Sequence, residues 1–431
     1  MTPGRLRLSL LALALLAGLA GCGGSKSGLP PFLCLACGTD ADCGGGGNRC
    51  LDLGSGAACG VDCSASSCPS GFVCAGITGG GSNCVPSSGS CPAVQPCNGG
   101  CKAGYTCDQA SDTCVAIPDG GPPQQDSAPA QLDASPSTNI SIIVEPSDNG
   151  NGLVNAIKGA TTSVHMTMYL LSSSKVTNAL IAAKNAGRDV KVILNQTFPT
   201  GGDSNTTAYS QLQSAGVQVH WAPSTFTLTH EKCAIIDGQT AWIMTMNATD
   251  SGMSGNREYI AIDTDADDVA EAEAIFEADF ASTAITPSGK LLVAPVNARD
   301  RLVALIGSAT STIDIEAEAL SDTAIVGRLA YAAGNRVTVK VVLSDDTPST
   351  AETSARTQLK AAGVQMVVLS NPYIHAKSMV VDGSLAYVGS INYTTSSMSY
   401  NRELGVIFST PAEVQKVLTT TRADFGQGTP L

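Results

Sequence analysis

The apolar and polar positions between residues 140 and 431 follow one pattern twice. In each copy, helical stretches alternate with strand-like runs, and valine, isoleucine and leucine dominate the buried strands expected at 190–194 and 339–343. Strands that alternate with helices predict α/β layers, in which helices cover a mixed β-sheet. We therefore expect two halves, 140–285 and 286–431, each a mixed β-sheet flanked by helices and related to the other by a pseudo-twofold axis.

Before residue 140 this periodicity is lost. The chain begins with two arginines and the apolar run 10–19, which is typical of a secretory signal and too short to span a bilayer with its flanks. Glycine, serine and cysteine then dominate, and a stretch rich in proline, glutamine, serine and aspartate follows, which predicts a flexible linker. We expect a signal peptide at 1–21, a cysteine-rich module at 22–115 and a linker at 116–139.

The signal ends in Leu19-Ala20-Gly21-Cys22, which resembles a bacterial lipobox. The resemblance implies cleavage before Cys22 and lipidation of its thiol; the alternative is an ordinary signal peptide beside an unrelated cysteine. Acyl chains would hold the protein at a membrane without a spanning helix. The expected location is therefore the bacterial cell envelope, with the protein exported and lipid-anchored on the periplasmic or the outer surface.

Sixteen cysteines are consistent with export, because disulfides persist in oxidising compartments. Fourteen of them lie between Cys34 and Cys114, where few large apolar side chains could form a core, so we expect a small disulfide-rich module. Zinc is the alternative, since Cys34 and Cys37 have ligand-like spacing, but neither a second such pair nor a histidine is near. The sequence leaves the disulfide pairing open.

The candidate chemistry lies in a His-x-Lys-x4-Asp pattern that occurs once in each half. An asparagine and a glutamate follow each copy, and the members of all five pairs are 145 residues apart: His230 and His375, Lys232 and Lys377, Asp237 and Asp382, Asn247 and Asn392, Glu258 and Glu403. One His-x-Lys is noise. Two copies in matched surroundings indicate a duplicated functional unit.

Each motif falls on a predicted β-strand that ends in an Asp-Gly turn, a hairpin signal. Side chains alternate along a strand, so the histidine and lysine of each motif share one face. Two such units facing each other would bring two imidazoles, two ammonium groups and two carboxamides to one pocket. This set suits a phosphodiester, because the lysines and asparagines can donate to its oxygens while the histidines act as nucleophile and acid.

The duplicated motif, with Gly389-Ser390-Ile391-Asn392 in the second copy, resembles the signature of the phospholipase D superfamily, and the resemblance covers about two thirds of the chain. It implies a phospholipase D-like fold and a covalent phosphohistidine that water or an alcohol resolves. It implies no metal and no cofactor. Because both half-sites lie in one chain, we expect a functional monomer.

The resemblance also implies a role for each residue. His230 would be the nucleophile and His375 the general acid. The other implied roles are phosphate binding by Lys232, Lys377, Asn247 and Asn392, orientation of the histidines by Glu258 and Glu403, and a structural role in the turn for Asp237 and Asp382. The first copy departs from the signature, because Met244-Thr245 stands where the second has Gly389-Ser390. Thr245 keeps a hydroxyl, whereas Met244 could crowd the pocket and reduce activity.

Other residues near the motifs have simpler interpretations. We expect Cys233 to be a buried free thiol. Exposure is expected for Glu316 and Glu318, with a position facing the pocket as the alternative, and a solvated helix face is expected for the acidic run 263–279. Residues predicted to be structural or exposed are His165 and His220, and those that could line the pocket mouth or simply pack are Trp221, Phe226 and Tyr373.

Charge bears on the substrate. Residues 140–431 hold 19 Lys and Arg against 28 Asp and Glu, without a basic cluster of the kind that nucleic-acid binders show. We therefore expect a phospholipase D-type enzyme that hydrolyses phospholipid head-group phosphodiesters or transfers the phosphatidyl group to an alcohol. Its partners would be phospholipid and the membrane. The alternatives are a metal-independent secreted nuclease of the same superfamily and an inactive surface-binding lipoprotein.

Overall fold

The computed structural model describes residues 48–52, 57–64, 68, 72–77, 81–87, 105–108, 113–116, 135–199 and 204–431. The chain divides into two compact units, 1–124 and 125–431, so the division falls within the predicted linker. The predicted signal peptide, Cys22 and the Cys34–Cys37 pair lie outside the described residues. In the described part of the chain, no helix has both the length and the apolar character needed to cross a bilayer.

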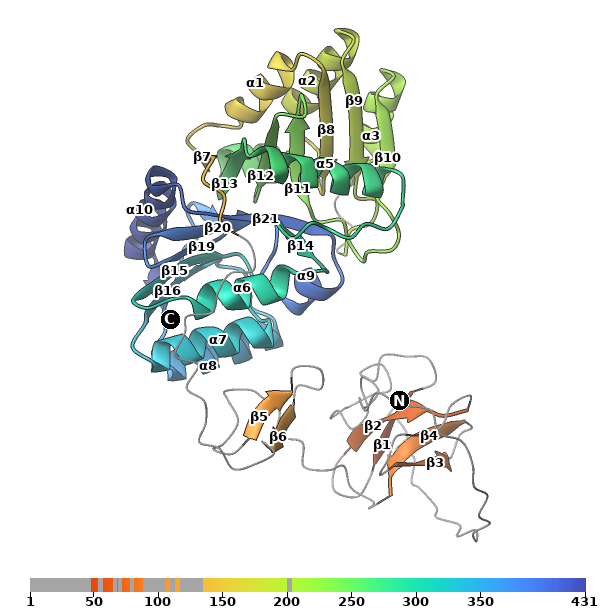
Figure 1. The fold of residues 1–431 in the computed structure, drawn as a ribbon, viewed down its shortest axis with the longest axis vertical. Helices are drawn as coiled ribbons and strands as arrows, with labels where there is room; N and C mark the ends of the chain where they lie inside the picture. Colours follow the sequence, from red (N-terminus) through yellow and green to blue (C-terminus); the bar gives the residue numbers. More distant parts are fainter. Residues whose placement is uncertain are drawn as a thin grey trace. The chain divides into compact units, whose positions relative to one another are not determined.

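The N-terminal unit is built from short antiparallel strands (Figure 1). Its four-stranded sheet has the order β1-β2-β4-β3, and a separate hairpin follows. The strands of the sheet are β1 (Arg49–Asp52), β2 (Ala57–Asp62), β3 (Phe72–Gly76) and β4 (Ser82–Pro86), and those of the hairpin are β5 (Tyr105–Asp108) and β6 (Thr113–Ala116).

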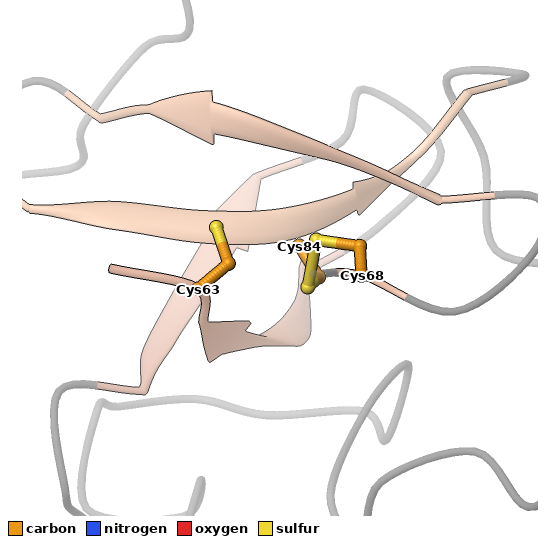
Figure 2. Close-up of side chains that lie close together, drawn as sticks. All are labelled: Cys63, Cys68 and Cys84. Carbon is orange, nitrogen blue, oxygen red and sulfur yellow. A yellow bond between two sulfur atoms is a disulfide. The ribbon is translucent and has the colours of Figure 1, made fainter. Parts of the chain in front are cut away.

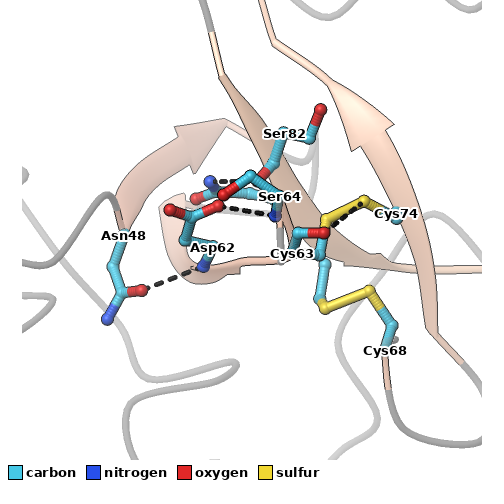
Figure 3. The surroundings of a disulfide bond; sticks show 9 residues. Asn48, Asp62, Cys63, Ser64, Cys68, Cys74 and Ser82 are labelled. Carbon is cyan, nitrogen blue, oxygen red and sulfur yellow. Dashed lines mark hydrogen bonds between the residues drawn. A yellow bond between two sulfur atoms is a disulfide. The ribbon is translucent and has the colours of Figure 1, made fainter. Parts of the chain in front are cut away.

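Disulfides crosslink the sheet, as the cysteine content predicts. Among them, one joins Cys63 to Cys74 and another joins Cys68 to Cys84 (Figures 2 and 3). The sulfurs of Cys63, Cys68 and Cys84 lie within 4.8 Å of one another, but all three are oxidised, so they do not form a metal site. The turn before Cys63 is held by Asp62, whose side chain accepts from the backbone N–H of Ser64 at 2.8 Å (Figure 3).

The first half of the C-terminal unit is a mixed sheet of order β10-β9-β8-β11-β12-β13, and β7 pairs with β13. Its strands are β7 (Ile140–Glu145), β8 (Ser163–Met168), β9 (Asp189–Leu194), β10 (Gln218–Trp221), β11 (Lys232–Ile236), β12 (Thr240–Met244) and β13 (Asn256–Asp263). Its helices are α1 (Asn151–Gly159), α2 (Ser174–Asn185), α3 (Thr206–Ser214), α4 (Asp250–Ser254) and α5 (Ala266–Phe280).

The second half repeats this plan in the order β14-β21-β20-β19-β15-β16-β17-β22. Its strands are β14 (Leu292–Ala294), β15 (Thr312–Ala317), β16 (Thr338–Leu343), β17 (Gln365–Val368), β18 (Tyr373–Ile374), β19 (Lys377–Val381), β20 (Leu385–Gly389), β21 (Glu403–Phe408) and β22 (Thr429–Pro430). Its helices are α6 (Ala298–Gly307), α7 (Thr323–Gly334), α8 (Thr350–Ala361), α9 (Thr395–Ser399) and α10 (Pro411–Gln427). The predicted pair of mixed sheets flanked by helices is confirmed.

The core is layered. In the first half, one face of the sheet packs against α1, α2 and α3, and in the second half one face packs against α6, α7 and α8. A third apolar cluster contains residues of both sheets together with α5 and α10. The outer faces of the two sheets are thus covered by α1, α2 and α3 and by α6, α7 and α8, and the sheets meet between these layers together with α5 and α10 (Figure 1). Cys233 belongs to this central cluster and is a buried free thiol, as predicted.

The segment before each motif crosses to the other half. Tyr373 and Ile374 in β18 pair in parallel with Asn256 and Arg257 in β13. The same exchange occurs on the other side, where Thr229 forms a parallel bridge with Arg402. The segment just before each motif histidine is therefore hydrogen-bonded to the other half. Its partner there lies in, or directly before, the strand that carries the motif glutamate of that half.

Two buried ion pairs also join the halves. Arg402 donates two hydrogen bonds to Asp279, at 2.8 and 3.0 Å, and Arg257 contacts Asp424 in the same two-pronged way, at 2.5 and 3.1 Å. Asp279 is buried, and burial raises its pKa even though Arg402 opposes the shift. The prediction that the acidic run 263–279 is a solvated helix face is therefore wrong for four of its residues, which are buried: Asp263, Asp268, Glu271 and Asp279. Asp279 neutralises an arginine of the other half, and Glu271 accepts from the backbone N–H groups of Gly289 and Leu291.

Candidate active site

Each motif histidine contacts the glutamate of the other half through its Nδ1. His230 Nδ1 lies 3.0 and 2.9 Å from the two carboxylate oxygens of Glu403. His375 Nδ1 lies 2.7 Å from Glu258 Oε1. A carboxylate on Nδ1 fixes the orientation of an imidazole and leaves Nε2 available for chemistry. The crossing of the chain described above thus makes each half-site depend on both halves.

A hydroxyl holds each glutamate from behind. Ser390 Oγ donates to Glu403 Oε2 at 2.6 Å, and Thr245 Oγ1 donates to Glu258 Oε2 at 2.5 Å. Both hydroxyls belong to fully buried residues. Thr245 therefore makes the same contact in the first copy that Ser390 makes in the second.

Met244 does not crowd the pocket. Its side chain is buried in the core of the first half, on the face covered by α1, α2 and α3. In the second half, the paired Gly389 and Gly405 leave room for Tyr387, because a Cβ on Gly405 would lie 2.5 Å from the tyrosine ring. In the first half, Met244 pairs with Ile260, and their side chains are part of that core. The departure from the signature is thus a change of core packing.

The two lysines are fully buried, and each donates to the backbone oxygen of its own motif histidine at 2.5 Å. Their other neighbours differ. Lys232 Nζ lies 4.8 Å from the ring centroid of Tyr169, whereas Lys377 Nζ contacts Glu318 Oε2 at 2.5 Å. Burial, and then repulsion from Lys377, lower the pKa of Lys232 to about 7, although nearby carboxylates oppose the shift.

Glu318 lies in the site, which is the alternative that the sequence left open and not the exposure that was expected. Besides Lys377 it accepts from Asn392 Nδ2 at 3.1 Å, and its Oε1 lies 3.7 Å from His375 Nε2. Burial alone would raise the pKa of Glu318, but the charges of His375 and Lys377 hold it well below its ordinary value. The predicted exposure is therefore wrong for Glu318, and also for Glu316, which is fully buried. The strand β15 is buried and ends just before Glu318. The alternation of side chains along this strand could have indicated that Glu318 faces the site.

The environment of His230 favours the neutral imidazole. Burial is the largest effect on its pKa, and Lys232 and Lys377 add to it, so the pKa falls below its ordinary value despite the attraction of Glu403. Because the charge of Lys377 acts on His230, the two half-sites share one electrostatic environment. A neutral imidazole with a free Nε2 is the form that a nucleophile requires.

The motif asparagines lie at equivalent places. The side-chain oxygens of Asn247 and Asn392 are buried and have no hydrogen-bond partner within the described part of the chain. An unpaired buried polar atom is costly, and such atoms are expected at ligand sites. The matched pair is consistent with a polar ligand between the halves.

The motif aspartates lie in the hairpin turns, away from the histidines. Asp237 accepts the backbone N–H groups of Thr161, Thr162 and Ser163, and Asp382 accepts those of Thr310, Ser311 and Thr312. Burial would raise the pKa of Asp382, but these hydrogen bonds lower it to about 2; the pKa of Asp237 is also depressed. Each aspartate thus ties its turn to the start of the neighbouring strand.

The remaining candidates divide between pocket and scaffold. Tyr373 lies near the site, with its ring centroid 6.5 Å from that of His375, whereas Phe226 stacks on Arg402 and Trp221 stacks on Tyr209. His220 stacks on Phe280 away from the motifs. His165, Glu273 and Glu277 lie close enough together to hold a metal ion. Apart from the oxidised cysteines, they are the only such group among the described residues. Lys191 Nζ lies 2.6 Å from Glu277 and supplies a cation there.

A protein-family model described as "Cardiolipin synthase, PLD-like domain" matches residues 153–280 and again 302–424. Among curated proteins, the cardiolipin synthase of Listeria monocytogenes serotype 4a (strain HCC23) is 21% identical over 327 residues, which are 64% of this chain and 67% of that protein. The cardiolipin synthase of Oceanobacillus iheyensis is 22% identical over 339 residues, covering 68% of this chain and 70% of that protein.

Solved structures show the same fold. The phosphatidylserine synthase of Haemophilus influenzae aligns with a TM-score of 0.54 and 11% identity over 69% of this chain and 88% of that one. The polyphosphate kinase of Porphyromonas gingivalis aligns with a TM-score of 0.51 and 15% identity over 66% of this chain, which spans half of that longer protein. The family model matches both halves, and these two halves together build one site in which each histidine contacts the glutamate of the other half. The chain therefore belongs to the phospholipase D superfamily.

Proposed function

We propose that this protein cleaves the head-group phosphodiester of a phospholipid and transfers the phosphatidyl group, through a covalent phosphohistidine, to water or to an alcohol. The observation that carries the proposal is the crossed pairing of the motif histidines with the motif glutamates, His230 with Glu403 and His375 with Glu258. The pairing orients two imidazoles within one shared site. An inactive scaffold has no need of two such oriented pairs.

In the first step Nε2 of His230 attacks phosphorus, and the bond from phosphorus to the leaving oxygen breaks. His375 gives its Nε2 proton to that oxygen, so the alcohol leaves neutral. In the second step water or an acceptor alcohol attacks phosphorus from the vacated side, and His375 takes its proton. The bond from phosphorus to His230 then breaks, which restores both histidines. The lowered pKa of His230 supports its role as nucleophile, and the carboxylates of Glu258 and Glu318 lie 2.7 and 3.7 Å from the two ring nitrogens of His375, the proposed general acid.

Phosphate binding falls to the lysines and asparagines. A phosphodiester between the two halves can accept from Lys232, Lys377, Asn247 and Asn392, of which Lys377 and Asn392 donate to Glu318 in this structure. Preorganised donors stabilise the charge that builds up on the phosphoryl oxygens in the transition state. The two ammonium groups are fully buried, so they interact more strongly with this charge than they would in water.

Three observations support phospholipid as the substrate. The acidic balance of 140–431 disfavours a polyanion, the curated relatives are named for cardiolipin synthesis, and a neighbour in fold is named for phosphatidylserine synthesis. Lipidation at Cys22, if the lipobox is used, would hold the site beside a bilayer. We propose that location, exported and anchored, as part of the function.

The test is an assay of the purified protein in EDTA on phospholipid vesicles, with plasmid and single-stranded DNA in parallel. We expect release or exchange of the head group by the wild type, and at least a thousandfold loss, on the order of removing a nucleophile, in His230→Ala. His220→Ala, which removes a histidine away from the motifs, is the matched control and should remain active. Undiminished head-group release by His230→Ala would refute the mechanism. Cleavage of DNA without any release of head group would show that the substrate is a nucleic acid and not a phospholipid.

A further inference from the structure

The two halves present different groups at one equivalent position of the site. Tyr169 follows β8 and donates its backbone N–H to the oxygen of Glu231, while Glu318 follows β15 and donates likewise to Ala376. The ring of Tyr169 lies 4.6 Å from that of His230. The half containing His230 therefore has an aromatic wall, whereas the half containing His375 has a carboxylate.

Glu318 occupies the donors that the second half offers to a phosphate. Its Oε2 accepts from Lys377 Nζ at 2.5 Å and from Asn392 Nδ2 at 3.1 Å. A substrate phosphate that uses these donors must take them from Glu318. The displaced carboxylate then lies beside a phosphodiester without Lys377 and Asn392, and only His375 Nε2, at 3.7 Å, remains near it. A charge that loses partners in a desolvated site is costly.

The surroundings of His375 add negative charge. Tyr373, next to His375 in space, donates its hydroxyl to Asp346 Oδ2 at 2.5 Å. Burial raises the pKa of the Tyr373 hydroxyl, and the charges of Glu318 and Asp346 raise it further. Both carboxylates thus act on the same side of the site. That side holds the leaving alcohol if His375 is the general acid, so the leaving alcohol enters a negative field.

We infer that Glu318 is a specificity-determining residue that selects phosphodiesters whose leaving alcohol carries a positive charge, such as choline or ethanolamine. A cationic group beside the phosphate replaces the partners that Glu318 gives up, whereas a neutral alcohol such as glycerol leaves the carboxylate uncompensated. The inference rests on the proposed function, because it takes the His375 side as the leaving-group side.

Two soluble diesters that share a glycerophosphate and differ only in the second alcohol test the inference. Binding of glycerophosphocholine and of glycerophosphoglycerol to the full chain is measured by calorimetry, so the result does not depend on turnover. We expect the wild type to bind glycerophosphocholine about tenfold more tightly, the order of one charge pair at a partly desolvated site. In Glu318→Gln, which keeps the shape and removes the charge, the two affinities should lie within about threefold of each other.

Asp345→Asn is the matched control, because it removes one negative charge from an exposed neighbour. It should keep the preference of the wild type. Equal affinities in the wild type, an unchanged preference in Glu318→Gln, or loss of the preference in Asp345→Asn would each overturn the inference. Binding of neither diester would overturn the proposed function as well. A preference that follows Glu318 in a protein that turns over no phospholipid would count against the proposed function alone.

Discussion

Lys232 and His230 show why residue identity alone does not define this site. The motif predicted both side chains, but their protonation comes from burial and from Lys377, a residue of the other half. Burial holds His230 in the neutral form and brings the pKa of Lys232 down to about 7. The proposed mechanism needs a neutral His230 and a protonated Lys232. Both conditions therefore hold together only over a limited range of pH.

We expect kcat/KM to fall by about tenfold per pH unit above pH 7, since the free enzyme then loses the Lys232 proton. The lower limb should begin below the ordinary histidine pKa, because His230 stays neutral there. Bound phosphate restores the charge of Lys232, so kcat should extend to higher pH than kcat/KM. The measurement is a pair of pH profiles.

Lys232→Arg identifies the group, because an arginine stays protonated throughout this range. Its residual kcat/KM should lose the limb near pH 7. The same limb in the variant would assign it to a group other than Lys232, and a flat wild-type profile up to pH 9 would contradict the lowered pKa.

We expect Thr245 to support catalysis through Glu258, which it contacts at 2.5 Å. Thr245→Ala removes a donor from a buried carboxylate, at a cost of about 1–3 kcal/mol, and we expect kcat to fall by about tenfold or more with little change in KM. Thr245→Ser keeps the hydroxyl and should restore most of the rate. Ser390→Ala is the matched change in the second half and should act alike. If Thr245→Ala is as fast as the wild type, the hydroxyl has no positioning role.

At the scale of elements, the sequence predicted the hairpins but not what they are tied to. Asp237 and Asp382 both have positive φ, followed by a glycine with positive φ, as the Asp-Gly signal implies. Their side chains bind the starts of β8 and β15, about 70 residues away in the chain. The local sequence pattern predicts a turn. The contact between the turn aspartate and a distant strand depends on the order of the strands in the sheet, which a local pattern does not contain.

Asp382→Asn isolates the charge, because asparagine tolerates the same left-handed backbone. We expect the melting temperature at pH 7 to fall by a few degrees. The folded-state pKa of Asp382 is about 2, below its ordinary value of 3.8, so its charge stabilises the fold above pH 4 and loses this effect as the pH falls toward 2. The gap between wild type and variant, followed by thermal melts, should close over that interval.

For this prediction too, Asp345→Asn serves as the control and should leave the melting temperature nearly unchanged. A gap that stays constant down to pH 2 would mean that the charge of Asp382 does not hold the turn.

At the scale of the whole molecule, the duplication was visible in the sequence and the crossing was not. The 145-residue spacing predicted two related halves and the residues of one shared site. It did not say that His230 takes Glu403 as its partner, because pairing within a half and pairing across halves give the same sequence pattern. Two triplets also recur in both halves, Asn-Arg-Glu at 256–258 and 401–403 and Ala-Asp-Phe at 278–280 and 423–425, but their arginines and aspartates pair only in the assembled molecule. Exposure was expected for Glu318 because this residue has no equivalent in the first half, where Tyr169 stands.

The buried pair of Arg402 and Asp279 should hold the halves together. Arg402→Ala leaves the Asp279 carboxylate buried without its cation, and we expect the free energy of unfolding to fall by about 3–5 kcal/mol. The double variant Arg402→Met with Asp279→Leu removes both charges and should recover part of that loss. Denaturant unfolding measures both. A double variant no more stable than Arg402→Ala would show that the penalty does not come from the unpaired aspartate.

The central claim is that both halves build one site in which His230 is the nucleophile. The most direct measurement is acid-quenched turnover of a phospholipid labelled in its phosphatidyl group, followed by peptide mapping of the labelled histidine. The account predicts label on His230 in the wild type, label that forms more slowly but on the same His230 in His375→Asn, and none in His230→Asn or when Glu403→Gln disorients the nucleophile from the other half. Label on His375, or turnover that labels no histidine, would contradict it.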